Sequence, residues 1–132
     1  MYQYKGQTIL NILLAEDDKN LGAIIKIELE EENHTVDLVH DGIEAVLHCI
    51  DKSYQFILLD IVMPNLDGIN ALRIIKRLDP KVPIIAFSGN AGSHQVEESC
   101  NSGAIMCLIK PFSMPKTLRS WANGARTILA AA

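Results

Sequence analysis

Along this chain, apolar runs of strand length alternate with segments whose apolar residues recur at helical spacing. We predict strands near residues 10–15, 34–39, 55–60, 82–87 and 105–109, and helices near residues 19–32, 42–52, 68–79, 93–102 and 114–130. Strands and helices that alternate in this way are typical of successive βα units around a parallel sheet. The pattern therefore predicts an α/β fold.

The composition of the individual segments predicts where each one lies in that fold. Four of the five strands are nearly continuous in apolar residues, which indicates that helices cover both faces of the sheet. The segment 34–40 instead alternates between polar and apolar residues, so we predict that the second strand lies at an edge. In the helix that follows it, the spacing of Ile43, Val46, Leu47 and Ile50 predicts the inner face.

Polar residues stand where four of the apolar strands stop. They are the pair Glu16-Asp17, then Asp60, Ser88 and Lys110. Parallel sheets bind their ligands beyond the carboxyl ends of their strands, so these side chains are expected to converge. Together they resemble a phosphoryl-accepting site.

Three carboxylates in one cleft repel one another unless a cation compensates them. Two like charges about 4 Å apart repel by about 4 kcal/mol at an effective dielectric constant of 20. Magnesium suits carboxylate, carbonyl and water ligands and keeps positions for a phosphate. A Mg²⁺ ion among Glu16, Asp17 and Asp60 is therefore the natural compensator.

Two further side chains suit a phosphoryl group bound to Asp60. The ammonium group of Lys110, ahead of Pro111, would neutralise the added negative charge. The hydroxyl of Ser88 would donate a hydrogen bond to a phosphoryl oxygen. Read singly, each of these residues is more often a helix cap, a turn or a solvated surface residue, and their joint placement favours the functional reading.

Size and charge narrow the class of protein. The 132 residues fit one domain, and no apolar run approaches the roughly 20 residues that span a bilayer. The net charge is −4, and no cluster of lysine and arginine marks a nucleic-acid surface. The start of the chain lacks a secretory signal, and neither the three cysteines nor the four histidines show metal-ligand spacing. We expect a cytoplasmic protein that binds neither membranes nor nucleic acid directly.

The motifs around these residues match a known family. Over residues 8–128 the chain resembles the receiver domain of two-component response regulators, with short terminal extensions at 1–7 and 129–132. The matching segments are Ile12-Leu13-Leu14-Ala15-Glu16-Asp17-Asp18, Asp41-Gly42-Ile43-Glu44-Ala45, Asp60-Ile61-Val62-Met63-Pro64-Asn65-Leu66-Asp67-Gly68, Phe87-Ser88-Gly89, Gly103-Ala104 and Lys110-Pro111-Phe112.

The resemblance implies a single-domain flavodoxin-like (βα)5 fold, with a five-stranded parallel sheet of order 2-1-3-4-5 and helices on both faces. It implies that Asp60 accepts a phosphoryl group from a histidine kinase or a histidine phosphotransfer protein. Asp17 and Asp60 would bind Mg²⁺ directly, Glu16 directly or through water, and Val62 through its backbone carbonyl.

The resemblance also implies how such a site is used. Lys110 would contact the phosphoryl group, Ser88 would move towards it, and the Lys110-Pro111 peptide would be cis. The domain would catalyse its own phosphorylation and dephosphorylation without being a separate enzyme. Phosphorylation would then switch a face that binds a downstream protein, either in a stand-alone receiver or in part of a larger regulator, and homodimerisation is left open.

Two positions depart from the family's usual pattern. Three residues before Lys110, many receivers carry an aromatic side chain that turns inward on activation, and here Cys107 stands in that position. Two residues after the acceptor, where polar side chains are common, the chain has Val62. The residues expected to bind metal and phosphate are present. The usual relay of activation from the hydroxyl residue to the aromatic residue is altered.

Three other functions fit the sequence less well. An aspartyl-phosphate hydrolase normally needs a second aspartate where Val62 stands, and a flavodoxin-like electron carrier needs a first loop rich in Ser, Thr and Gly rather than Glu16-Asp17-Asp18. No GxGxxG or GxxxxGK sequence supports a nucleotide site. A receiver-like module that is never phosphorylated is disfavoured because every chemical position is filled.

Overall fold

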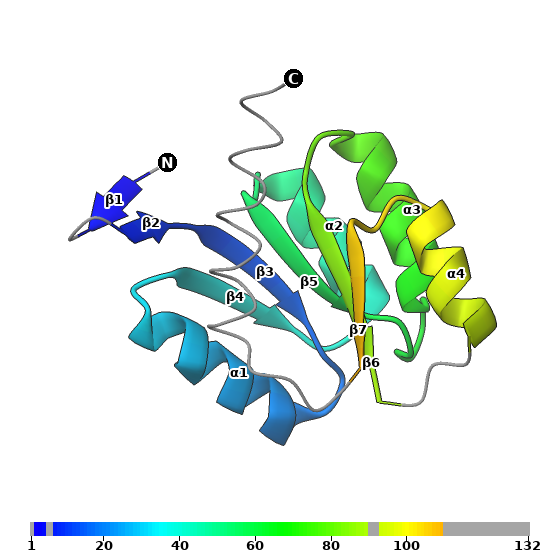
Figure 1. Cartoon of the computed structure of the whole chain (residues 1–132), viewed down its shortest axis with the longest axis horizontal. Helices are drawn as coiled ribbons and strands as arrows, with labels where there is room; N and C mark the ends of the chain where they lie inside the picture. Colours follow the sequence, from blue (N-terminus) through cyan, green and yellow to red (C-terminus); the bar gives the residue numbers. More distant parts are fainter. Residues whose placement is uncertain (1, 5–6, 90–92, 110–132) are drawn as a thin grey trace.

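A computed structural model describes residues 2–4, 7–89 and 93–109, and its central feature is a five-stranded parallel sheet (Figure 1). The sheet strands are β3 (Asn11–Ala15), β4 (Thr35–Val39), β5 (Phe56–Asp60), β6 (Ile84–Ser88) and β7 (Met106–Ile109). The helices are α1 (Lys19–Glu31), α2 (Gly42–Asp51), α3 (Gly68–Leu78) and α4 (Ser93–Asn101). The fifth predicted helix, at 114–130, lies outside the described residues.

The strand order is β4-β3-β5-β6-β7. Counted from the first predicted strand, this is 2-1-3-4-5, so the predicted topology is confirmed, and β4 lies at the predicted edge. A short antiparallel hairpin of β1 (Tyr2–Tyr4) and β2 (Gln7–Ile9) precedes the sheet and was not predicted.

The two faces of the sheet have separate cores because side chains alternate along each strand. On β3, Leu13 and Ala15 pack in one cluster with buried side chains of α2 and α3. The neighbouring Ile12 and Leu14 pack in the other cluster, with buried side chains of α1. Helices therefore cover both faces of the described sheet.

The predicted inner face of α2 is wrong for three of its four residues. Ile43, Leu47 and Ile50 are 48%, 53% and 60% exposed. The buried residues of α2 are Gly42 and Ala45, while Val46 is partly buried against the core. Small residues face inward because the helix begins in close contact with a neighbouring loop, where a Cβ on Gly42 would lie 2.0 Å from the carbonyl oxygen of Leu66.

Aspartates start the three helices that follow β3, β4 and β5. The N-caps of α1, α2 and α3 are Asp18, Asp41 and Asp67, and each side chain accepts a hydrogen bond from a backbone N–H of the first turn. These caps fix the loops at the carboxyl edge of the sheet. No helix within the described ranges is long and apolar enough to cross a bilayer.

Gly68 lets α3 begin directly against β5. A Cβ at this position would lie 2.0 Å from the carbonyl oxygen of Asp60, and the Gly68 N–H donates to the Ile61 carbonyl at 2.8 Å. The three nearest atoms are all backbone atoms of Asp60 and Ile61, so a Cβ there has no flexible side chain to displace at its closest contacts.

We expect Gly68→Ala to lower the free energy of unfolding by roughly 2–4 kcal/mol, because the β5–α3 loop has to move. Gly22→Ala in α1 is the matched control. Its Cβ would meet the end of the Leu38 side chain at 3.0 Å, and alanine favours the helix by about 1 kcal/mol. Urea denaturation of both variants tests this, and equal stability of Gly68→Ala and wild type would refute the backbone contact.

His34 gives the fold a pH dependence. The backbone N–H of Leu10 donates to His34 Nδ1 at 3.0 Å, so the ring accepts this bond in its neutral form. Burial lowers the pKa of His34 below 6.5, against an opposing attraction to Glu32. Below that pH the unfolded chain binds the proton more readily than the folded chain does.

Stability should therefore be fully present above about pH 6.5 and should decline as the pH falls towards the folded-state pKa of His34. In His34→Asn, the side-chain oxygen can accept from Leu10 without titrating. Chemical denaturation from pH 7.5 to 5 should show a smaller decline for this variant than for wild type. Parallel stability curves would contradict the assignment.

Candidate functional site

The first predicted acidic pair stands at the end of β3. Glu16 is fully buried, and its backbone N–H donates to the Val39 carbonyl at 3.0 Å, which continues the β3–β4 pairing by one residue. Asp17 is exposed. The strand thus delivers one carboxylate to the interior and one to the rim at the same edge of the sheet.

Asp60 is the last residue of β5, a strand that is buried along its whole length. Its side chain is 3% exposed, and its Oδ1 accepts a hydrogen bond from the Val62 N–H at 3.0 Å. The Val62 side chain is 53% exposed. The chain therefore turns sharply after Asp60, and the turn itself orients the carboxylate.

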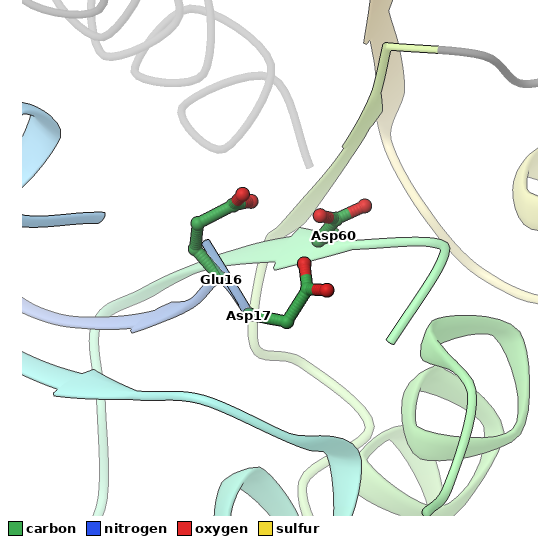
Figure 2. Close-up of side chains that lie close together, drawn as sticks. All are labelled: Glu16, Asp17 and Asp60. Atoms are coloured by element: carbon green, nitrogen blue, oxygen red, sulfur yellow. The ribbon is translucent and has the colours of Figure 1, made fainter. Parts of the chain in front are cut away.

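Glu16, Asp17 and Asp60 converge as predicted. One carboxylate oxygen from each lies within 4.8 Å of the others, and Figure 2 shows the three side chains gathered beyond the ends of β3 and β5. The pairing of Ala15 with Leu59 makes these two strands direct neighbours. Charges at this separation repel by roughly 3–4 kcal/mol per pair at an effective dielectric constant of 20.

The donor set fits a hard divalent cation. All three groups offer carboxylate oxygen, which Mg²⁺ and Ca²⁺ prefer, and among the described residues no nitrogen or sulfur ligand belongs to the cluster. Two of the carboxylates are buried, so water compensates their charge less well than at an open surface. A cation bound among them would neutralise this charge.

Ser88 lies at the neighbouring strand end. Asp60 pairs with Phe87, so Ser88 stands one residue beyond the partner of the acidic residue, and it is 2% exposed. On its other side Ser88 pairs with Ile109. Lys110, the remaining predicted site residue, and its peptide with Pro111 lie outside the described residues.

Cys107 is half-buried in β7, opposite Ala86, and packs against the core shared with α2 and α3. Burial raises the pKa of its thiol, against a hydrogen bond with Ser99 that lowers it. Ser99 is a fully buried residue of α4. The side chain at the family's aromatic position is therefore a neutral thiol that contacts α4.

Sequence analysis missed two residues that hold the loops of the site. His40 Nδ1 lies 3.0 Å from the Glu16 carbonyl oxygen, and Asn65 Nδ2 donates to Asp41 Oδ2 at 2.9 Å. Neither contact leaves a periodic pattern in the sequence. The position of Asn65 between Pro64 and Asp67-Gly68 was the available signal, since Asn tolerates its φ of 67°.

Comparison with known proteins identifies the family. The protein-family model described as the response regulator receiver domain matches residues 12–121. The chain belongs to the response regulator receiver family. It is 33% identical over 107 residues to the response regulator ArlR of Staphylococcus saprophyticus, which covers 81% of this chain and 48% of ArlR. This receiver chain therefore spans about half the length of the curated relatives it matches first.

Solved receiver structures agree with this fold. The Francisella response regulator 1452 receiver domain is 32% identical, with a TM-score of 0.78 over 89% of this chain and 98% of that one. The receiver domain of the sensor histidine kinase PA1611 of Pseudomonas aeruginosa is 35% identical, with a TM-score of 0.77 over 85% of this chain and 93% of that one. That structure has a magnesium ion coordinated in its active-site cleft.

The carboxylate cluster predicts how charge affects the stability of this receiver. Asp17→Asn removes one of the three like charges, so the metal-free protein should become more stable by a few tenths to about 1 kcal/mol. Wild type should gain stability as Mg²⁺ is added, and Asp17→Asn should gain less. Thermal unfolding with and without Mg²⁺ measures both effects.

Asp18→Asn is the matched control, because Asp18 lies outside the cluster and Asn caps a helix as well as Asp does. It should respond to Mg²⁺ like wild type. Identical Mg²⁺ responses in Asp17→Asn and Asp18→Asn would show that Asp17 does not belong to a cation site.

Proposed function

We propose that this receiver accepts a phosphoryl group on Asp60 in a Mg²⁺-dependent reaction. The observation that carries the proposal is the convergence of Glu16, Asp17 and Asp60 within 4.8 Å at the carboxyl edge of the sheet. The proposed ligands of Mg²⁺ are these three carboxylates and the backbone carbonyl of Val62. The proposed receiver spans residues 8–128, somewhat beyond the matched region.

The proposed donor is the phosphohistidine of a histidine kinase or of a histidine phosphotransfer protein. The carboxylate oxygen of Asp60 attacks phosphorus, the P–N bond to the imidazole breaks, and a P–O bond forms. The imidazole nitrogen keeps the electron pair and takes up a proton. The Val62 N–H holds Asp60 Oδ1 in place, which restricts the carboxylate before the donor arrives.

Bound Mg²⁺ supplies positive charge that offsets the phosphoryl oxygens and the carboxylates together. The chain's own residues do the remaining work. We propose that the ammonium group of Lys110 neutralises the added charge of the phosphoryl group and that the Ser88 hydroxyl donates to a phosphoryl oxygen, because Ser88 stands beside Asp60 at the next strand end. Positioning and charge neutralisation would thus let the domain catalyse its own phosphorylation and dephosphorylation.

The proposed output is a protein contact rather than direct binding to nucleic acid. Response regulators act on downstream targets, and we propose that this chain binds a downstream protein. Homodimerisation is left open. We place the protein in the cytoplasm, a reducing compartment, which suits the free thiols of Cys49, Cys100 and Cys107.

Phosphorylation with acetyl phosphate tests the acceptor. In the presence of Mg²⁺, wild type should gain the mass of one phosphoryl group and Asp60→Asn should gain none, because the amide cannot form the acyl phosphate. Chelation of Mg²⁺ should abolish the gain in wild type. Intact-protein mass spectrometry under conditions that preserve acyl phosphates gives the readout.

Asp67→Asn serves as the control for this experiment, since it changes another aspartate of the same loop and keeps the helix cap. It should label as wild type does. Equal labelling of Asp60→Asn, or no labelling of wild type with a range of small donors and kinases, would overturn the proposed function.

A further inference from the structure

The proposed metal ligands lie on two separate loops. Glu16 and Asp17 begin the loop after β3, whereas Val62 lies in the loop that follows Asp60 and β5. A third segment touches both of these loops. It is the turn between β4 and α2, formed by His40, Asp41 and Gly42, and is called here the 40–42 turn.

The first contact of this turn, called here the His40 arm, is with the loop that begins at Glu16. His40 Nδ1 lies 3.0 Å from the Glu16 carbonyl oxygen, and since a carbonyl only accepts, Nδ1 is the donor. The Glu16 N–H already donates to the Val39 carbonyl at 3.0 Å. Both backbone groups of Glu16 are therefore held by the end of β4 and its turn. The His40 N–H in turn donates to Glu44 Oε2 at 2.8 Å, which ties the turn to α2.

The second contact of this turn, called here the Asp41–Asn65 arm, is with the loop after Asp60. Asp41 Oδ1 accepts from the Glu44 N–H at 2.8 Å as the cap of α2, while Oδ2 accepts from Asn65 Nδ2 at 2.9 Å. Hydrogen bonds from Glu44 and then from Asn65 outweigh desolvation and lower the pKa of Asp41. An ionised carboxylate makes the bond to Asn65 a charge-assisted one.

A backbone contact lies directly beside this second arm. A Cβ on Gly42 would lie 2.0 Å from the Leu66 carbonyl oxygen and 2.8 Å from its carbonyl carbon. The start of α2 and the loop after β5 thus meet without an intervening side chain. Asn65 stands next to this contact with a φ of 67°, a left-handed conformation that asparagine adopts more readily than most residues other than glycine.

We propose that the 40–42 turn is a brace that positions the metal ligands of the two loops relative to each other. Its His40 arm sets the backbone of Glu16. Its Asp41–Asn65 arm sets the loop that presents the Val62 carbonyl. Asp41, His40 and Asn65 are positioning residues, since they act through Glu16 and Val62. This inference rests on the proposed function for the identity of the site, but the contacts of the brace are themselves part of the fold.

Two variants cut the Asp41–Asn65 arm without other damage. Asn65→Gly removes the side-chain donor and keeps a residue suited to positive φ. Asp41→Ser keeps an N-cap for α2 and removes the second oxygen. Asn70→Ala is the matched control, because Asn70 Nδ2 donates to Asp67 Oδ2 at 3.0 Å in an exposed Asn–Asp pair that does not reach α2.

The first readout is the Mg²⁺ dependence of labelling by acetyl phosphate. The half-saturating Mg²⁺ concentration should rise roughly threefold to tenfold in Asn65→Gly and in Asp41→Ser, because each loses one hydrogen bond that holds a ligand-bearing loop. The maximal rate at saturating Mg²⁺ should stay close to that of wild type. The double variant should be no weaker than either single variant, since both changes remove the same bond.

The second readout needs no metal. Amide exchange at Val62 should accelerate in Asn65→Gly by a similar factor, because the Val62 N–H donates to Asp60 only while the loop is held. Unchanged exchange and unchanged Mg²⁺ dependence in both variants would overturn the brace. Equal effects from Asn70→Ala, or additive losses in the double variant, would also overturn it.

The two proposals fail in different ways. Faster exchange at Val62 in Asn65→Gly, with no binding of Mg²⁺ and no labelling in wild type, would support the brace as a link between the loops and reject the proposed function. Labelled wild type with wild-type behaviour of both brace variants would support the proposed function and reject the brace.

Discussion

Direct parallel pairing of β3 with β5 is the constraint on which the rest of this receiver depends. Because no strand separates them, the residues that follow Ala15 and Leu59 meet at one edge of the sheet, and Glu16, Asp17 and Asp60 lie within 4.8 Å of one another. Such a cluster is unfavourable without a cation. The buried apolar strands on which it sits provide the stabilisation that keeps these charges together, and the cluster offers carboxylate oxygens, the ligands that hard cations prefer.

The strands and the acidic cluster could be predicted from the sequence because their signals are local, whereas the strand order followed from the resemblance to the receiver family. An apolar run that stops at Asp60 marks both a buried strand and the position of its carboxyl end, and a parallel sheet then brings such ends together. The inner face of α2 could not be predicted in this way. Its periodicity favoured Ile43 and Leu47, but the close contact of Gly42 with Leu66 places the helix so that its small residues face inward. That contact is tertiary, and the spacing of apolar residues does not encode it.

The supporting residues of the site were missed for a related reason. The bond from His40 to Glu16 and the bond from Asn65 to Asp41 each join residues 24 positions apart. In each of these bonds one polar partner lies in a turn. For such a segment the sequence composition indicates only that a loop is present. Residues that carry the chemistry of a site can thus be recognised by their type and position in the sequence. The residues that orient them become visible only in the folded structure, where the loops come together. Ser88, a proposed site residue, falls between these cases, since its position at a strand end was predictable from sequence and its burial required the structure.

The two sides of the site differ in how they are held. Towards α2, hydrogen bonds and a backbone contact join three loops, and the helices α1 and α3 bury aliphatic side chains such as Leu29 and Ile75. Towards α4, the described contacts are polar: Arg73 pairs with Glu98 at 3.0 Å, and Ser99 is the buried side chain that meets Cys107. An exposed ion pair contributes about 0–1 kcal/mol, less than one buried aliphatic side chain. Among the described contacts, those of α4 are therefore the weaker ones, so we expect a displacement caused by the proposed phosphorylation of Asp60 to cost least towards α4.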